Sequence, residues 1–136
     1  MHPIYSLCIK VSFDTFLKPS FSKNSGAKVS TTICDGLKVG VLVCADSWFD
    51  ERPASLKEQG AEIIIDIAAW PETPETGNPI PSWIKVNRNT GIPFVVNNQT
   101  GKTKWMDMSI GESVLIQDEE VICKYSGDAA VLLFDF

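Results

Sequence analysis

Histidine is nearly absent from this chain of 136 residues, which contains only His2, among its first residues. A cysteine or serine that reacts through a histidine needs the imidazole within hydrogen-bond reach. Chain ends are usually mobile, so His2 is a poor candidate for that role. Any nucleophile in this chain is therefore expected to rely on a carboxylate or a lysine to handle its proton.

The chain also lacks an excess of positive charge and a long apolar run. Its 12 Lys and Arg residues stand against 17 Asp and Glu residues, for a net charge of -5, which argues against a nucleic-acid partner. No apolar run reaches the roughly 18 residues of a membrane span, and the first residues have no basic signal-peptide region. With 44% hydrophobic and 21% charged residues, we expect a cytoplasmic globular protein with no membrane partner.

The four cysteines form no C-x-x-C pair and have no metal-ligand spacing, so neither a metal nor another cofactor is expected. Cys8, Cys34 and Cys123 lie in apolar, strand-like runs and are interpreted as buried free thiols in a reducing compartment. Cys44 differs, because the run Leu37 to Val43 is typical of a strand buried on both faces and ends at this cysteine. Open α/β sheets carry their chemistry at such strand ends, which makes Cys44 the candidate nucleophile.

Hydrophobic periodicity predicts an α/β chain of short strands with two helices. Strands are expected at residues 4–11, 29–34, 37–44, 63–67, 94–98, 113–116, 121–125 and 129–134. Helices are expected at residues 51–59 and at about 81–89, the first capped by Asp50 or Ser47 and facing the sheet through Ala54 and Leu56. Asp35-Gly36 signals a tight hairpin, and the strand–helix–strand order over residues 37–67 predicts a parallel βαβ unit.

Two strand ends are therefore expected to emerge side by side, at Cys44 and at residues 68–70, with residues 97–99 beside them. Asp46 is expected to fix the turn after the first strand by accepting hydrogen bonds from backbone N–H groups. For Trp70 the sequence leaves two interpretations open, which are packing in the core and lining a substrate pocket. A pocket at these ends would contain a thiol, indole rings and amide side chains.

The segment from Gly36 to Glu51, G-L-K-V-G-V-L-V-C-A-D-S-W-F-D-E, resembles the nucleophile segment of the carbon-nitrogen hydrolase, or nitrilase, family. Further matches follow in the family's order: Gly60-Ala61-Glu62, Ala68-Ala69-Trp70, Trp83, residues 91–96, Asn98-Gln99-Thr100-Gly101 and Gly111-Glu112-Ser113. The likeness covers nearly the whole chain. It implies the α/β fold of that family, a four-layer αββα sandwich, with the N-terminal half absent. Residues 1–136 would then form a single, partial carbon-nitrogen hydrolase domain.

The resemblance also implies catalytic roles. By position, Cys44 would be the nucleophile, and Lys10 together with the backbone N–H of Ala45 would stabilise the oxyanion. Lys10 is alternatively a solvated lysine at a strand end. Trp48 and Trp70 would belong to the substrate site. The family's general-base glutamate lies upstream of its lysine and has no counterpart in this sequence, and neither does the histidine that follows the lysine, where Ser12 stands.

The implied reaction is hydrolysis of a non-peptide C–N bond through a cysteine acyl-enzyme. The run Cys44-Ala45-Asp46 is closer to the amidases and carbamoylases of the family than to its nitrile-cleaving members, which usually read C-W-E. A small amide or N-carbamoyl compound is therefore the expected substrate. Because the family's glutamate has no counterpart here, turnover is expected only when the missing half of the domain is present. Two alternatives stay open, a pseudoenzyme without turnover and a self-associating interaction module. A family tendency to pair near the nucleophile helix implies a homo-oligomer in each case.

Overall fold

The computed structural model describes residues 28–133, and Val29–Ala129 forms one compact unit. In chain order its elements are β1 (Thr31–Cys34), β2 (Leu37–Val43), the short 3₁₀ helix η2 (Cys44–Trp48), α1 (Glu51–Glu58), β3 (Ile63–Ala68), α2 (Ile80–Thr90), β4 (Phe94–Asn98), β5 (Ser113–Gln117) and β6 (Glu120–Tyr125). The strand expected at residues 4–11 lies outside the described residues, as do Cys8 and Lys10. Neither α-helix of the described part has the length and apolar character needed to cross a membrane.

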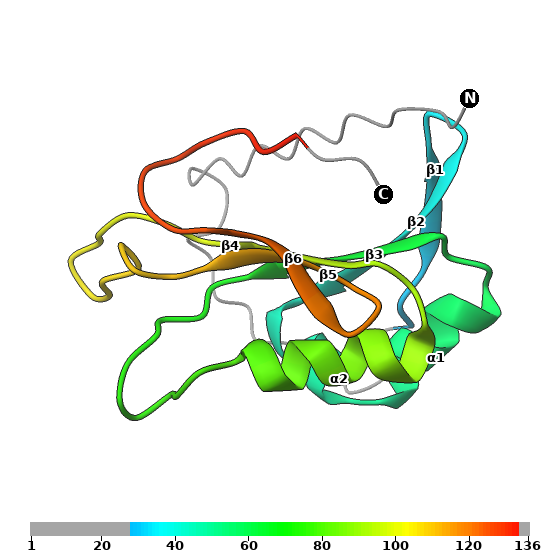
Figure 1. Ribbon diagram of the computed structural model, residues 1–136, viewed down its shortest axis with the longest axis horizontal. Helices are drawn as coiled ribbons and strands as arrows, with labels where there is room; N and C mark the ends of the chain where they lie inside the picture. The colour runs from blue at the N-terminus through cyan, green and yellow to red at the C-terminus, as the bar shows by residue number, and fades with distance from the viewer. Residues whose placement is uncertain (1–27, 134–136) are drawn as a thin grey trace. The chain divides into compact units, whose positions relative to one another are not determined.

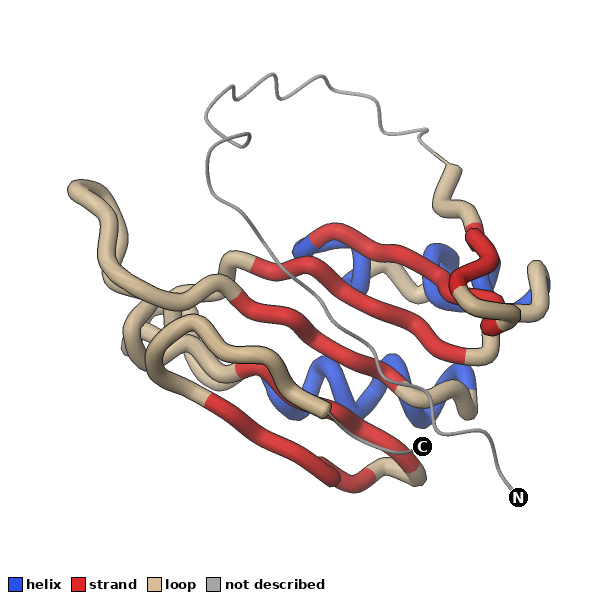
Figure 2. Tube along the Cα trace, turned by 90° about the horizontal axis from the view of Figure 1, so that it is seen from above, coloured by secondary structure: helices blue, strands red, loops and turns tan. Residues whose placement is uncertain are grey.

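The six strands form one sheet in the order β1-β2-β3-β4-β5-β6 (Figure 2). β2, β3 and β4 are mutually parallel, whereas β1, β5 and β6 join antiparallel. The register pairs Val43 with Ile67 and Ala68 with Asn98. The carboxyl ends of the three parallel strands therefore meet at one edge of the sheet, as expected for a βαβ unit.

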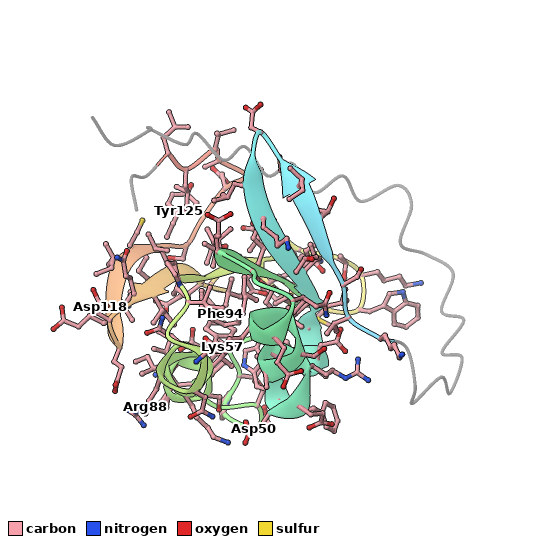
Figure 3. The ribbon with its side chains drawn as sticks, turned by 90° about the vertical axis from the view of Figure 1, so that its right-hand side faces the viewer. Asp50, Lys57, Arg88, Phe94, Asp118 and Tyr125 are labelled. Carbon is pink, nitrogen blue, oxygen red and sulfur yellow. The ribbon has the colours of Figure 1, made fainter. Side chains whose placement is uncertain are left out.

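Both helices lie on the same face of the sheet (Figure 1). The core forms where β-strand side chains of this face meet Leu56 of α1 and Trp83 of α2, which are 0% and 2% exposed. Phe94 of β4 lies inside this layer, whereas Arg88 and Asp118 lie at the periphery (Figure 3). Burial of these large apolar side chains is the main stabilising contribution to such a fold.

The predicted turns and helices agree closely with the structure. Asp35 and Gly36 both have positive φ values, 53° and 85°, and close the β1–β2 hairpin, as a type I′ turn requires. α2 ends at Gly91, which adopts the left-handed conformation that glycine tolerates best. The expected helices at 51–59 and 81–89 are thus confirmed to within a residue or two.

Three expectations about single elements were wrong. No strand forms over residues 129–133, the described part of the expected last strand. Leu56 faces the sheet as expected, but Ala54 is exposed and Pro53 is the other buried residue of α1. Asp50 occupies the N-cap position without capping through its side chain, because its carboxylate binds Lys85 Nζ at 2.9 and 3.0 Å. Ser47 lies within η2 and is not a cap of α1.

Candidate active site

Cys44 lies where β2 ends and η2 begins, at the edge where the parallel strands terminate. Its φ is 52°, in the left-handed region that residues other than glycine seldom adopt. Strained conformations of this kind concentrate at functional sites. The thiol is free and the residue is half-buried, so Cys44 can be reached while its backbone is held by the strand.

Asp46 braces the turn that carries Cys44. Its Oδ2 accepts a hydrogen bond from the Val43 N–H at 3.1 Å, and its Oδ1 lies 2.5 Å from Arg52 Nη1 of α1. The Asp46 and Arg52 side chains are 24% and 23% exposed, so this ion pair is partly shielded from water. The predicted role of Asp46 in fixing the turn through a backbone N–H is confirmed.

Trp48 and Trp70 come together beside this turn. Their ring centroids are 4.9 Å apart and the rings meet edge to face at 75°. Trp48 is half exposed, whereas Trp70 is partly buried and donates from Nε1 to the Gly77 carbonyl at 3.2 Å. The two indoles of the predicted site thus form one aromatic surface, with Trp70 as its fixed member.

Asn98 ties the end of β4 to the residues that follow β3. Its Oδ1 accepts from the Trp70 N–H at 2.8 Å, and its Nδ2 donates to the Trp70 carbonyl at 3.0 Å. Oδ1 also accepts from the Gln99 N–H at 3.1 Å. The expected position of residues 97–99 beside the end of β3 is confirmed at Asn98, and these hydrogen bonds fix the backbone of Trp70.

Asp66 in the middle of β3 is a buried acid that its sequence context did not reveal. It is 1% exposed, and neither carboxylate oxygen has a hydrogen-bond partner within the described residues. Burial raises its pKa from 3.8 to about 7; the Ser47 hydroxyl and the Cys44 backbone lie beside it and lower the pKa in part, and Asp46 raises it further. Ser47 is itself buried and donates to the Cys44 carbonyl at 2.9 Å.

The remaining predicted residues are placed only in part. Lys10 lies outside the described residues, so its distance from Cys44 is not defined. Ala45 is exposed on η2, directly after the candidate nucleophile. Cys34 is exposed and Cys123 half-buried, so the expectation that these free thiols are buried was wrong, because β1 and β6 are the edge strands of the sheet. In the part of the chain that the structure describes, no group of three or more His, Cys, Asp or Glu side chains is arranged to hold a metal ion.

The sequence and the fold match one family in comparisons with known proteins. The family model described as Carbon-nitrogen hydrolase matches residues 2–132. A structure of the amidase of the nitrilase superfamily from Nesterenkonia AN1 superposes with a TM-score of 0.70 at 19% identity, covering 81% of this chain and 42% of that one. Among curated proteins, no relative matches.

Two further solved structures have the same fold. Nit3 of Saccharomyces cerevisiae, a member of branch 10 of the nitrilase superfamily, gives a TM-score of 0.65 at 15% identity over 74% of this chain and 38% of that one. A carbon-nitrogen hydrolase from Helicobacter pylori G27 gives 0.58 at 23% identity, over 74% of this chain and 40% of that one. The chain therefore spans about two fifths of the length of these relatives.

Proposed function

This chain belongs to the carbon-nitrogen hydrolase family, and we propose that it provides the cysteine nucleophile, Cys44, for hydrolysis of small amide or N-carbamoyl compounds. The observation that carries the proposal is the position of Cys44 itself. It is a half-buried free thiol, in a left-handed conformation, at the carboxyl end of a central parallel strand. Chemistry in open α/β sheets is located at this edge.

In the proposed reaction the Cys44 thiolate attacks the carbonyl carbon of the substrate. The C–N bond breaks, the amine or ammonia leaves with the proton that the thiol lost, and a thioester forms on the sulfur. Water then attacks the thioester carbonyl, releasing the acid and restoring the thiol. The oxyanion of each tetrahedral intermediate would be stabilised by the backbone N–H of Ala45, an exposed residue, and by Lys10, a role worth about 3 to 4 kcal/mol per donor in acyl transfer.

The aromatic surface of Trp48 and Trp70 would bind the apolar part of the substrate next to the thiol. Support for an amide comes from the Nesterenkonia enzyme. In one structure of a variant of that amidase, the acetamide moiety of fluoroacetamide is covalently attached to the active-site cysteine. We extend that chemistry to Cys44 of this chain, with the amide and N-carbamoyl classes preferred over nitriles.

Release of ammonia from a panel of amides, N-carbamoyl compounds and nitriles tests this proposal. Joined to the glutamate-bearing first half of a related enzyme, the chain should release ammonia from the first two classes. Cys44→Ser should abolish the release, whereas Cys34→Ser, at an exposed thiol, should leave it unchanged. Preferential release from nitriles would overturn the substrate class. A chain whose Cys44 is alkylated but which releases no ammonia from any compound would be a pseudoenzyme.

We also propose that the protein acts in the cytoplasm as a homo-oligomer, with residues 1–136 as a single, partial domain. The three cysteines of the described part are free thiols, which fits a reducing compartment. Val43, Trp48 and Phe49 each leave about half of their surface exposed near the candidate site, and exposed apolar groups of this kind favour association. Light scattering tests the proposed homo-oligomer. A molar mass equal to that of the monomer at all protein concentrations would contradict it.

A further inference from the structure

Asp66 is the one charged side chain in the layer between the sheet and the helices of the described unit. On β3 it alternates with Ile64 and Ala68, which belong to the hydrophobic core. In the neighbouring strands it pairs with Leu42 and Val96, both fully buried. A charged carboxylate in such surroundings is unfavourable unless it is paired, which favours the neutral form of Asp66.

The Ser47 hydroxyl is the group that connects Asp66 to the candidate nucleophile. This hydroxyl has a single proton, which it donates to the Cys44 carbonyl at 2.9 Å. Its oxygen lies beside the Asp66 carboxyl group and lowers the pKa of that acid in part. Neither Asp66 oxygen has a partner with good hydrogen-bond geometry within the described residues. This arrangement suits a neutral Asp66, which can donate its proton to the Ser47 oxygen and extend the chain of hydrogen bonds to Cys44.

An ionised Asp66 has different requirements. A carboxylate only accepts hydrogen bonds, so it would compete with the Cys44 carbonyl for the single Ser47 proton. Besides Ser47, the groups that act on Asp66 are the Cys44 backbone and the Asp46 carboxylate, and Asp46 is already paired with Arg52 of α1. The residues beside it on β2 and β4 are apolar. Ser47 is therefore the nearby side chain that can respond when Asp66 loses its proton to solvent.

We propose that Asp66 is a positioning residue for Cys44 that acts through the Ser47 hydroxyl: neutral Asp66 keeps this hydroxyl on the Cys44 carbonyl, and ionised Asp66 withdraws it. The proposal rests on the assignment of Cys44 as nucleophile and adds a means of controlling it. Withdrawal of the hydroxyl removes its hydrogen bond to the Cys44 carbonyl and so loosens the turn from Cys44 to Trp48 that holds the thiol in place. The reactivity of Cys44 should then depend on the ionisation of a group outside the reaction centre.

The test is the pH dependence of alkylation of the full chain by iodoacetamide, measured at each cysteine by peptide mass spectrometry. The exposed Cys34 serves as the internal standard. Between about pH 6 and pH 8 the rate at Cys44, relative to Cys34, should fall on the order of tenfold as Asp66 ionises, because a nucleophile that is no longer held in position reacts more slowly. In Asp66→Asn, whose amide can still donate to Ser47, the relative rate should stay constant.

Two further variants separate the possible routes. Asp50→Asn changes an exposed acid, and in this variant the alkylation rate of Cys44 relative to Cys34 should fall with pH as it does in the unmodified chain. Ser47→Ala should lose most of the fall, because the hydroxyl that transmits it is gone; a full fall in this variant would show an effect through space alone and overturn the role of Ser47. An unchanged fall in Asp66→Asn would overturn the proposal. Neither result depends on turnover, so failure of ammonia release would leave this test intact.

Discussion

At the scale of single residues, the candidate site contains two aspartates in opposite situations. Asp46 has both carboxylate oxygens occupied, by the Val43 N–H and by Arg52. Asp66 lies deeper, with no hydrogen-bond partner among the described residues. Paired acids stabilise a fold and unpaired buried acids destabilise it, so substitutions at these two positions should have effects of opposite sign.

Asp46→Ala is expected to lower the free energy of unfolding by about 1–2 kcal/mol. The substitution leaves the Val43 N–H without its acceptor and the partly buried Arg52 without its partner. Urea denaturation measures the change. Asp107→Ala is the matched control, since its ion pair with Lys102 has side chains 47% and 74% exposed and should leave the midpoint almost unchanged. An equal loss of stability in Asp46→Ala and Asp107→Ala would contradict the stabilising role of the Asp46 hydrogen bond and ion pair.

Asp66 should make the stability of the protein depend on pH. Its pKa is about 7 in the folded chain, against an ordinary value of 3.8, so the folded state binds the extra proton between these values and stability falls as pH rises. At about 1.4 kcal/mol per pH unit the full fall is roughly 4 kcal/mol. Urea denaturation of Asp66→Asn should therefore show a gain over the unmodified chain at pH 8 that vanishes near pH 4. A gain independent of pH would contradict a buried, titrating carboxyl group.

At the scale of elements, the approach of α1 to β2 depends on the absence of a side chain at Gly40. A Cβ at this position would lie 2.9 Å from Leu56 Cδ1 and 3.2 Å from Leu56 Cβ. Leu56 is fully buried, so it could move away only by displacing its neighbours in the core. Gly40 thus allows α1 to approach the sheet closely, and α1 is the helix whose Arg52 pairs with Asp46.

Gly40→Ala should lower stability by about 1–3 kcal/mol, the usual cost of overpacking a core. Urea denaturation checks this expectation. The double variant with Leu56→Val removes part of the obstructing side chain, and should cost less than the sum of the two single substitutions. Strict additivity would show that the Cβ of residue 40 does not meet Leu56.

The side chain of Asn98 should hold the aromatic surface in place at the ends of β3 and β4. Asn98→Ala removes both hydrogen bonds to the Trp70 backbone, and we expect a loss of about 2–3 kcal/mol together with faster amide hydrogen exchange at Trp70. Asn97→Ala, next along the strand with its side chain on the other face, is the control. An unchanged rate of amide hydrogen exchange at Trp70 in Asn98→Ala would contradict the role of these two hydrogen bonds.

At the scale of the whole molecule, local sequence patterns predict well where the strands and helices of the described unit lie. They predict poorly which segments find a pairing partner and which faces become buried. The pair Asp35-Gly36 and the run Ile63–Ala68 carry their own turn and strand signals. Residues 129–133 are equally apolar yet form no strand, because a strand also needs a partner, which periodicity cannot supply. The predicted meeting of the Cys44 and Trp70 segments follows from parallel order alone, and the structure confirms it.

Burial is the part of the site that local patterns do not contain. Asp66 stands alone in an apolar run, and the same pattern would fit an acid on a solvated face. Only the two helices packed on one side of the sheet make this position part of the core (Figure 1). For the same reason the sequence suggests Ser47 as a helix cap, because its contact with the Cys44 carbonyl depends on the 3₁₀ turn.

The central claim is that Cys44 is a nucleophile activated by its position, and fluoroacetamide tests it most directly. The full chain is incubated with this compound and the modified cysteine is identified by peptide mass spectrometry. Cys34 is the more exposed thiol, so accessibility alone would place the adduct there. The account predicts an adduct at Cys44 that is lost in Cys44→Ser; an adduct confined to Cys34, or shared according to exposure, would contradict it.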